Sequence, residues 1–510
     1  MARPRNLHWL IVVPLLLYAA WLGARSLNVD AIWLDEYYSI FESGGAQYGP
    51  LSPLDIALRV AGYAVWPPGY NYFLAGWGVL VGWTPLAARV LSWLLGLLAI
   101  AVIYRLAREL MPQKRQFALF ATVFISGSAF YLYYFHELRG YSFHVLFGLI
   151  ATMLYWRLIR RADRWPAQIG FAAALVLLLY SHPVGQLWFA MLAGFHIAFE
   201  WRNSQWKRVL FLFLVAVLFY APWLAFMLIK TAQAVSIPGA IDTPLILGAA
   251  AAAFSNWLTI PTAILGILSL RLIRQRSIQF LWWWLIGLVA LTLLVNRIIP
   301  FLFHIRHLIA VLPALMLLAA AGLIQLQRFR WLQAAICAVW LIMGVYLSFH
   351  PTFASDLPGA LRMISRPGFE AALQALAQNA DPDDAVIFRL ADQDVEYLYA
   401  PPLDYYLEGS PLHFSLLSMV NARDDVLIDD RSFTEIPFEQ RLQAFVGESP
   451  RLWVAEIPGL VADSQMETLR ALIADSYQPC AMVVDMPDMR VELYAQDGQC
   501  MSWLSNNARF

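Results

Sequence analysis

The sequence predicts an α-helical polytopic membrane protein of about eleven transmembrane helices with a C-terminal soluble α/β domain. Of the 510 residues, 60% are hydrophobic and only 14% are charged, which excludes an ordinary soluble protein. The charges divide near His350: 25 Lys and Arg against 10 Asp and Glu up to that residue, and 10 against 25 after it. This asymmetry predicts a basic, apolar domain over 1–350 and an acidic, polar domain over 351–510.

Eleven segments have the roughly 20 mostly apolar residues that a spanning helix needs. Arg3 and Arg5 precede the first, which we interpret as an uncleaved span and not a signal peptide. Tyr70–Trp83 is apolar but too short, so we predict that it lies at the membrane surface. The eleven predicted spans are 7–25, 86–107, 117–135, 142–159, 168–182, 184–200, 208–229, 248–270, 278–296, 306–326 and 331–349.

Basic residues set the predicted orientation, because short cytoplasmic loops carry an excess of Lys and Arg. With Tyr70–Trp83 outside the count, 18 of the 25 basic residues before His350 fall in cytoplasmic loops. The N-terminus is then cytoplasmic and the C-terminal domain extracytoplasmic, in a multi-pass protein of the inner or plasma membrane. Seven of the ten carboxylates before His350 face outward on this topology: Asp30, Asp35, Glu36, Glu42, Asp55, Glu137 and Asp242.

The outer loop over 26–85 is too long for a simple connector. Ser52-Pro53 predicts the start of an amphipathic helix that runs to Tyr63, because proline suits the first helical position. Trp66-Pro67-Pro68-Gly69 then interrupts the chain before the second surface helix.

The polar C-terminal part alternates between helix-like and strand-like patterns, which favours an α/β layer domain. Cys480 and Cys500 bracket the last two strands; a disulfide and two buried free thiols both fit this spacing. The third cysteine is Cys337, and the three form no metal-ligand spacing. The predicted helices are Gly368–Gln378, Phe438–Phe445 and Ser464–Ser476, and the predicted strands are Ala385–Phe388, Val426–Ile428, Leu452–Glu456, Ala481–Val484 and Arg490–Tyr494.

Asp35 and Glu36 are adjacent carboxylates about ten residues beyond the first span. A transferase that joins a sugar to a hydroxyl needs a base for the hydroxyl proton, and a carboxylate is a common choice. Asp35 suits that role. The alternative is an acidic N-cap pair that opens a short surface helix.

His136-Glu137-Leu138-Arg139-Gly140-Tyr141 forms a short outer turn between the third and fourth spans. Ionisable side chains at membrane level are costly and more often functional than not. The alternative is a solvated turn in which Glu137 and Arg139 neutralise each other.

Four outward-facing arginines are candidates to hold a lipid-linked phosphate, because the guanidinium group binds phosphate oxygens in pairs. Arg306 is the first choice, since His304 and His307 flank it; the others are Arg89, Arg139 and Arg297. Snorkelling to lipid headgroups is the alternative for each. His182, in Ser181-His182-Pro183, is interpreted as a polar cap at a helix break.

In this order along the chain, the motifs resemble the GT-C glycosyltransferases, in the branch of the protein O-mannosyltransferases and lipid A aminoarabinose transferase. The resemblance covers residues 1–350. Two positions depart from the family pattern: His307 stands where Tyr is usual, and Trp66 where some members have a basic residue. The matching pieces are Asp35-Glu36, Pro67-Pro68-Gly69-Tyr70, Arg89–Glu109, His136–Ser142 and His304–Pro313.

The resemblance implies a polyprenyl-phosphate sugar donor, an acceptor hydroxyl on a glycan, lipid or protein, and inversion at the anomeric carbon. It implies Asp35 as general base, with Glu36 and Glu137 as further catalytic carboxylates, and a possible Mg²⁺ or Mn²⁺ on Asp35 and Glu137. Membrane lipids are expected partners and nucleic acid is not. Arg306, Arg139, Arg89 and His307 would bind the donor phosphate, and Trp66, Pro67, Pro68, Tyr70, His136, Tyr141 and His182 would line the lipid and acceptor groove.

Two other classes of protein remain open at this point. A lipid or sugar-lipid transporter would place charges or broken helices near the bilayer midplane. A non-catalytic membrane assembly factor would have no need of converging carboxylates.

Overall fold

A computed structural model describes most of the helical part of the chain and about half of the rest. It covers residues 10, 12–25, 27–28, 32–63, 66–160, 165–233, 243–299, 301–302, 304–350, 367–381, 383–389, 405–406, 415–419, 426–429, 434–437, 449–456, 464–487 and 489–501. Asp30, Asp242 and the predicted helix Phe438–Phe445 lie outside the described residues.

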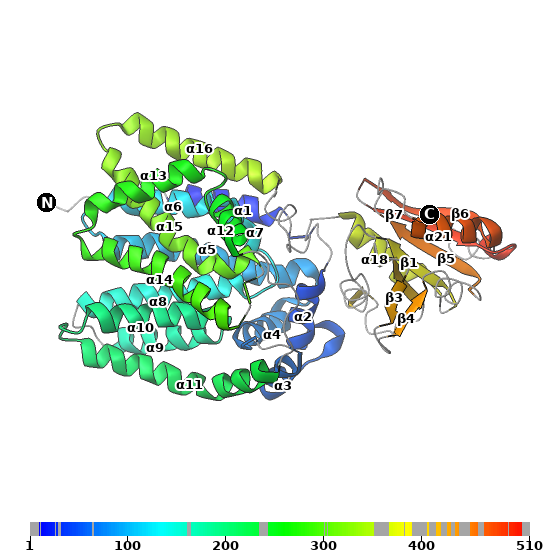
Figure 1. Ribbon diagram of the computed structural model, residues 1–510, viewed down its shortest axis with the longest axis horizontal. Coiled ribbons are helices and arrows are strands. Elements are labelled where there is room, and N and C mark those ends of the chain that lie inside the picture. Colours follow the sequence, from blue (N-terminus) through cyan, green and yellow to red (C-terminus); the bar gives the residue numbers. More distant parts are fainter. Residues whose placement is uncertain are drawn as a thin grey trace. The chain divides into compact units, whose positions relative to one another are not determined.

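The chain forms two compact units. The first comprises Met1–Leu27 and Leu51–Ile364, and the second comprises Asn28–Pro50 and Ser365–Phe510. In Figure 1 the first unit is a bundle of helices and the second contains the β-sheet.

Among the described residues of the first unit, six helical stretches are long and apolar enough to cross a membrane, and the bent pair α12 and α13 makes a seventh if it is one span. The helix α11 leaves Phe211, Leu218 and Phe219 more than 60% exposed, as expected of side chains that face lipid and not water. The six are α5 (Pro85–Leu110), α8 (Tyr141–Arg160), α11 (Trp206–Gln233), α14 (Arg276–Ile298), α16 (Arg330–Phe349) and the run of η4 (Ile305–Val311), α15 (Leu312–Leu323) and η5 (Ile324–Leu326).

Four shorter apolar helices match the remaining predicted spans, so all eleven predicted segments are largely helical. Because these four have only 12 to 15 residues, the count of eleven crossings stays a prediction. They are α1 (Val12–Ala24), α6 (Arg115–Ser126), α9 (Trp165–Leu179) and α10 (Gly185–Phe199).

Two segments predicted as continuous helices are broken. The predicted span 248–270 is α12 (Thr243–Phe254) followed by α13 (Thr259–Ser269) and η3 (Leu270–Leu272), with a bend of 85°. The predicted span 117–135 is α6 followed by the short helix α7 (Ala129–Tyr134).

One side chain connects these two breaks. Asn256 is fully buried and takes a left-handed backbone conformation with φ of 50°, which Asn tolerates better than most residues. Its amide group donates to the Gly127 carbonyl at 2.6 Å and accepts from the Ala129 amide at 3.0 Å. Backbone groups that leave a helix inside a membrane need such partners, so Asn256 stabilises the α6–α7 break.

Two helices follow in the outer-loop segment. The predicted helix from Ser52 is α3 (Pro53–Tyr63), and the Ser52 hydroxyl accepts the Asp55 amide at 3.2 Å, as an N-cap does. The second helix, α4 (Gly69–Val81), has 13 residues. That is shorter than the roughly 20 residues a straight span needs, as expected for Tyr70–Trp83.

The second unit contains the predicted α/β layers. A five-stranded sheet has the order β2-β1-β5-β7-β6. Strands β2, β1 and β5 are parallel to one another, and β7 is antiparallel to both of its neighbours, β5 and β6. A separate hairpin pairs β3 with β4. The elements are α2 (Leu34–Glu42), η2 (Ala46–Tyr48), α18 (Pro367–Asn379), β1 (Ala385–Arg389), β2 (Ser415–Met419), β3 (Val426–Asp429), β4 (Thr434–Pro437), β5 (Arg451–Glu456), α21 (Ser464–Ser476), β6 (Gln478–Met486) and β7 (Met489–Ala495).

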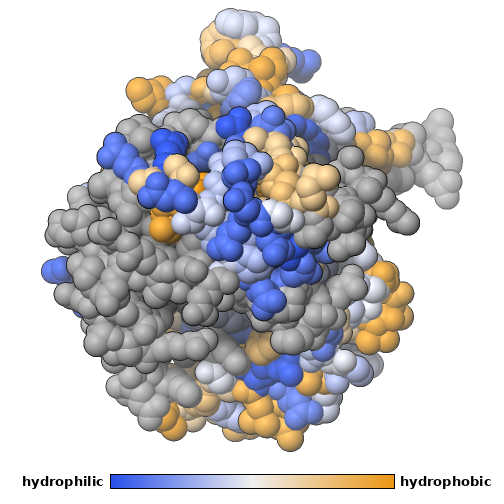
Figure 2. All heavy atoms as spheres, turned by 90° about the vertical axis from the view of Figure 1, so that its right-hand side faces the viewer, coloured by the Kyte–Doolittle hydropathy of each residue, from blue (hydrophilic) through white to orange (hydrophobic). Residues whose placement is uncertain are grey.

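Both faces of the five-stranded sheet are covered by helix. Leu373 and Leu376 of α18 share one core with Trp453. Leu469 of α21 shares the other core with Leu452. Two adjacent residues of β5 thus point to opposite faces, as the period of a strand requires. On the face shown in Figure 2, many of the described residues nearest the viewer are hydrophilic.

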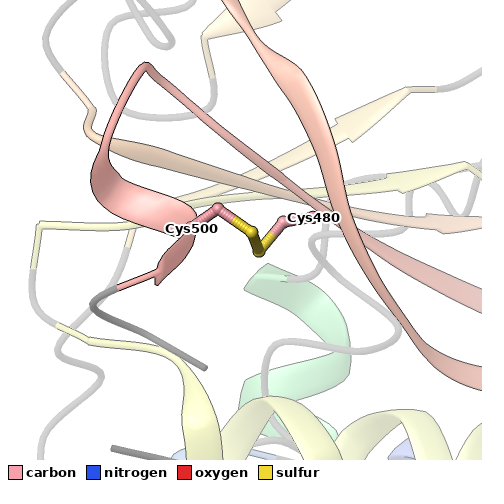
Figure 3. The surroundings of a disulfide bond; sticks show 2 residues. All are labelled: Cys480 and Cys500. Carbon is pink, nitrogen blue, oxygen red and sulfur yellow. A yellow bond between two sulfur atoms is a disulfide. The ribbon is translucent and has the colours of Figure 1, made fainter. Parts of the chain in front are cut away.

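Cys480 and Cys500, which the sequence left open, form a disulfide (Figure 3). It ties β6 to the turn after β7 across a sequence separation of 20 residues. Disulfides persist mainly in oxidising compartments, so this bond supports an extracytoplasmic position for the second unit.

Candidate active site

The acidic pair Asp35-Glu36 lies in the first turn of α2, in the second unit. Trp33 is the N-cap residue and makes no side-chain capping bond, so neither acid is the cap that the alternative interpretation assumed. Glu36 is 2% exposed, whereas Asp35 is half-buried. Carboxylates at this end of a helix are favoured by its dipole.

The segment around α2 is held by tyrosines from elsewhere in the second unit. The Ile32 amide donates to the Tyr406 hydroxyl at 3.0 Å, and the Gln47 side chain donates to the Tyr405 carbonyl at 3.4 Å. Tyr37 stacks on Phe41 with ring centroids 5.8 Å apart. The acidic pair therefore lies in a helix that is held by other residues of the second unit, and not in an open loop.

In the first unit, the turn between α7 and α8 carries Glu137. Its side chain is 4% exposed and that of His136 is 8% exposed. The Nδ1 atom of His136 donates to the Leu132 carbonyl at 3.0 Å, since a carbonyl only accepts. Burial of both side chains argues against a simple solvated turn.

Two glycines allow three segments to approach this turn closely. The Gly69 amide donates to the Tyr180 carbonyl at 2.9 Å, and a Cβ at Gly69 would lie 2.4 Å from that oxygen. A Cβ at Gly140 would lie 3.2 Å from the Ser181 carbonyl and 3.3 Å from Cβ of Tyr70. The double-proline segment, the Glu137 turn and the turn between α9 and α10 therefore pack against one another.

A hydroxyl pair strengthens this packing. The Tyr70 hydroxyl lies 2.7 Å from the Ser92 hydroxyl on α5, and Ser92 also contacts the Arg139 carbonyl at 3.4 Å. Ser92 could not be singled out from the sequence, because serine is common in spanning helices.

Cations and aromatic rings gather at the same place. The Arg139 guanidinium lies 5.8 Å from the Trp66 ring, and that of Arg306 lies 5.8 Å from the Tyr141 ring. These are cation–π distances. Arg306 is 6% exposed and follows a buried His304 at the start of η4.

His182 lies at the centre of this group. Its ring centroid is 4.7 Å from that of Trp66, 5.9 Å from that of Tyr141 and 6.2 Å from that of His307. We refer to Trp66, Arg139, Tyr141, His182, Arg306 and His307 as the basic cluster.

Hydrogen bonds fix the neutral form of His182. Its Nδ1 accepts the Val184 amide at 3.1 Å, so the ring proton is on Nε2, which can donate to an anion. Burial is the main reason that the pKa of His182 lies well below its usual value, and Arg139 and Arg306 lower it further. Burial, with Arg306 nearby, also lowers the pKa of His304 to about 3.

The structure adds His144 to the predicted residues. It lies one turn after Tyr141 on α8, and its Nδ1 is 2.9 Å from the Ser181 hydroxyl. That hydroxyl donates to the Leu178 carbonyl at 2.6 Å, so His144 is the donor to it. A histidine three positions from Tyr141 inside an apolar span was the signal that could have indicated it.

The two remaining predicted arginines, Arg89 and Arg297, differ in burial. Arg89 is 2% exposed and donates to the Leu27 carbonyl at 3.1 Å, just beyond α1. Arg297 is exposed in the last turn of α14. No group of three or more His, Cys, Asp or Glu within the described ranges is placed to hold a metal ion.

Comparison with known sequences relates part of the chain to one family. Residues 65–226, which contain Trp66, Arg139, Tyr141 and His182, match the family model described as dolichyl-phosphate-mannose-protein mannosyltransferase. No curated protein sequence matches the chain.

Solved structures share the fold over nearly the whole chain. ArnT from Cupriavidus metallidurans in the apo state has a TM-score of 0.55 and 14% identity, covering 94% of this chain and 97% of ArnT. The same ArnT bound to undecaprenyl phosphate gives 0.55 and 15%, covering 96% and 98%. The arabinofuranosyltransferase AftD from Mycobacteria gives 0.51 and 14%, covering 97% of this chain and 40% of AftD.

The apolar helices and these matches indicate a multi-pass membrane protein with the fold of the ArnT glycosyltransferase. Within it, residues 65–226 match the mannosyltransferase family model. These similarities favour a glycosyltransferase over the transporter and assembly-factor alternatives.

Proposed function

We propose that the protein transfers a sugar from a polyprenyl-phosphate donor to an acceptor hydroxyl at the extracytoplasmic membrane face, with inversion at the anomeric carbon. The observation that carries this proposal is the basic cluster, in which two guanidinium groups and a neutral histidine donor gather beside buried Glu137. Similarity to ArnT, whose structure was solved with undecaprenyl phosphate, supports the lipid carrier.

In the proposed reaction, the acceptor oxygen forms a bond to the anomeric carbon while the bond from that carbon to the phosphate oxygen breaks. The electron pair of the broken bond leaves with the phosphate, which stays on its lipid. Asp35 takes the acceptor proton. Attack opposite the leaving group inverts the configuration.

The cations act on the leaving phosphate. Arg306 and Arg139 stabilise its developing charge, with His307 and Arg89 in support, because fixed positive groups favour the transition state in which that charge grows. Glu137 orients or polarises the reacting groups. Trp66, Pro67, Pro68, Tyr70, His136, Tyr141 and His182 border the groove for lipid and acceptor.

A divalent cation is a further proposal. Carboxylate oxygens suit Mg²⁺ or Mn²⁺, and Asp35 and Glu137 are the carboxylates that would hold it. The acceptor is a hydroxyl of a glycan, a lipid or a protein.

The donor is tested by thermal unfolding of the purified protein with a panel of polyprenyl-phosphate sugars. The correct donor should raise the unfolding temperature, because a ligand that binds only the folded state stabilises it. Polyprenyl phosphate without sugar should stabilise less, and the free sugar should not stabilise at all. If no lipid-linked sugar shifts the transition, the proposed donor class is wrong.

The proposed face is tested by labelling with an impermeant thiol reagent in a Cys337→Ser background. A cysteine placed at Gln113, in the loop between α5 and α6, should stay unlabelled from outside because that loop is predicted to be cytoplasmic. Glu467→Cys on α21 is the matched control and should label from outside, since Glu467 is exposed. Labelling at Gln113 and protection at Glu467 would invert the topology.

A further inference from the structure

A cavity of about 400 Å³ lies at the end of the helical unit away from the basic cluster. Arg160, the last residue of α8, lines this cavity, whereas Tyr141, the first residue of α8, belongs to the basic cluster. A helix of 20 residues is about 30 Å long. The cavity is therefore a separate place from the proposed active site, and on the predicted topology it faces the cytoplasm.

The lining of the cavity is positively charged. Lys114, Arg160 and Arg276 line it with a single carboxylate, Glu200. That carboxylate is already satisfied, because it accepts Arg276 Nε at 3.0 Å and the Asn203 side chain at 3.0 Å. The net charge of the lining is +2.

Two of the cations have bonding capacity to spare. The Arg160 guanidinium donates only to the Glu109 carbonyl, at 3.4 Å, among the residues that the structure describes. The Lys114 ammonium makes no hydrogen bond or ion pair within those same residues. Both side chains are exposed, so a ligand in the cavity can reach them.

A buried hydroxyl adds a second, independent observation. Ser277 lines the cavity and is 5% exposed, and its hydroxyl has no hydrogen-bond partner within the described ranges. It is the second residue of α14, whose N-cap, Gln275, makes no side-chain capping bond. A hydroxyl at the start of a helix, where the helix dipole is positive, favours an anion.

We propose that this cavity binds a phosphate group, held by Lys114, Arg160 and Ser277. Phosphate offers several acceptor oxygens and negative charge, which match the donors that remain available. The other walls include Leu110, Trp156 and Ile159, so an anionic phospholipid and a soluble phosphate share the chemistry that the cavity recognises. A basic pocket beside apolar wall is a setting in which lipid headgroups bind.

The test compares three probes on the full-length protein in detergent: phosphatidylglycerol, phosphatidylcholine and inorganic phosphate. Binding is measured by native mass spectrometry for the lipids and by thermal shift for inorganic phosphate. We expect phosphatidylglycerol to bind more tightly than phosphatidylcholine. The variant Lys114→Gln/Arg160→Gln should lose on the order of tenfold in affinity, because each basic group near a membrane surface contributes modestly.

A charge-matched control is Arg328→Gln/Arg330→Gln, which removes two exposed cations from another predicted cytoplasmic loop. It should bind like the wild type. Ser277→Ala keeps every charge and should weaken binding a few-fold without loss of folding, because it removes a hydroxyl that bonds to no described residue. An effect on inorganic phosphate alone assigns the site to a soluble ligand. Equal losses in both double variants, or no preference over phosphatidylcholine and no response to phosphate, would overturn the proposal.

Discussion

Replacing Asp35 with Asn is expected to abolish sugar transfer while the protein stays folded and still binds its lipid donor. The amide keeps the volume of the carboxylate but cannot take up the acceptor proton. Loss of general-base catalysis lowers the rate of the chemical step by on the order of 10²–10⁴-fold. Initial rates with a lipid-linked sugar donor, together with the unfolding temperature, measure both parts of this prediction.

The structural alternative for Asp35 predicts a much smaller effect. Asp35 is in the first turn of α2 and is not the N-cap, so Asn there would lose the attraction to the helix dipole, about 0.3–1 kcal/mol. Asp55→Asn is the matched control, because Asp55 is an exposed carboxylate in the first turn of α3 and has no proposed catalytic role. Comparable turnover by wild type and Asp35→Asn would remove Asp35 as the base and leave Glu36 and Glu137 to be tested.

Replacing Arg306 with Ala is expected to weaken donor binding by on the order of tenfold or more, and to affect donor binding more than folding. A hydrogen bond to a charged group contributes about 1.5–3 kcal/mol, and the proposed partner of this guanidinium is the donor phosphate. Lys at the same position should restore binding only in part, because an ammonium cannot form the paired bonds of a guanidinium. Donor affinity in nanodiscs provides the measurement.

Arg297→Ala is the control for Arg306, since Arg297 is an exposed cation predicted on the same face. If binding depends on a cation within the basic cluster, the Arg297→Ala variant should bind the donor like the wild type. Unchanged donor affinity in Arg306→Ala would exclude Arg306 from the site. Equal weakening in both variants would instead indicate a general electrostatic effect on lipid binding.

Much of the fold could be predicted because the length of an apolar segment and the alternation of residues along a strand are local properties of a sequence. The helix Ser464–Ser476 was predicted to the residue, and α18 within one residue at each end. The short strands β2 and β4 were not predicted, since apolar and polar residues alternate only weakly in their sequences. They form strands by pairing with β1 and β3. The bend between α12 and α13 was also missed, because the hydrogen bond that Asn256 makes at this bend reaches Ala129, 127 positions away in the sequence.

Part of the candidate site could also be predicted from the sequence, and part could not. Arg306 and Glu137 could be singled out from local patterns, because ionisable residues are rare beside apolar spans. What the sequence could not show is that Trp66 and His307 both lie against His182. Such contacts depend on close approaches at Gly69 and Gly140, and glycine spacing alone does not reveal which segments will meet.

The amide of Asn256 also limits how the catalytic unit can move. Asn256 lies at the α12–α13 bend, and its side chain bonds to Gly127 and Ala129 at the α6–α7 break. We therefore expect these two breaks to move together. Separating them would leave buried polar groups unsatisfied, at about 1–3 kcal/mol for each. We therefore expect α7, to which His136 is bonded, to keep its position relative to the bend at Asn256.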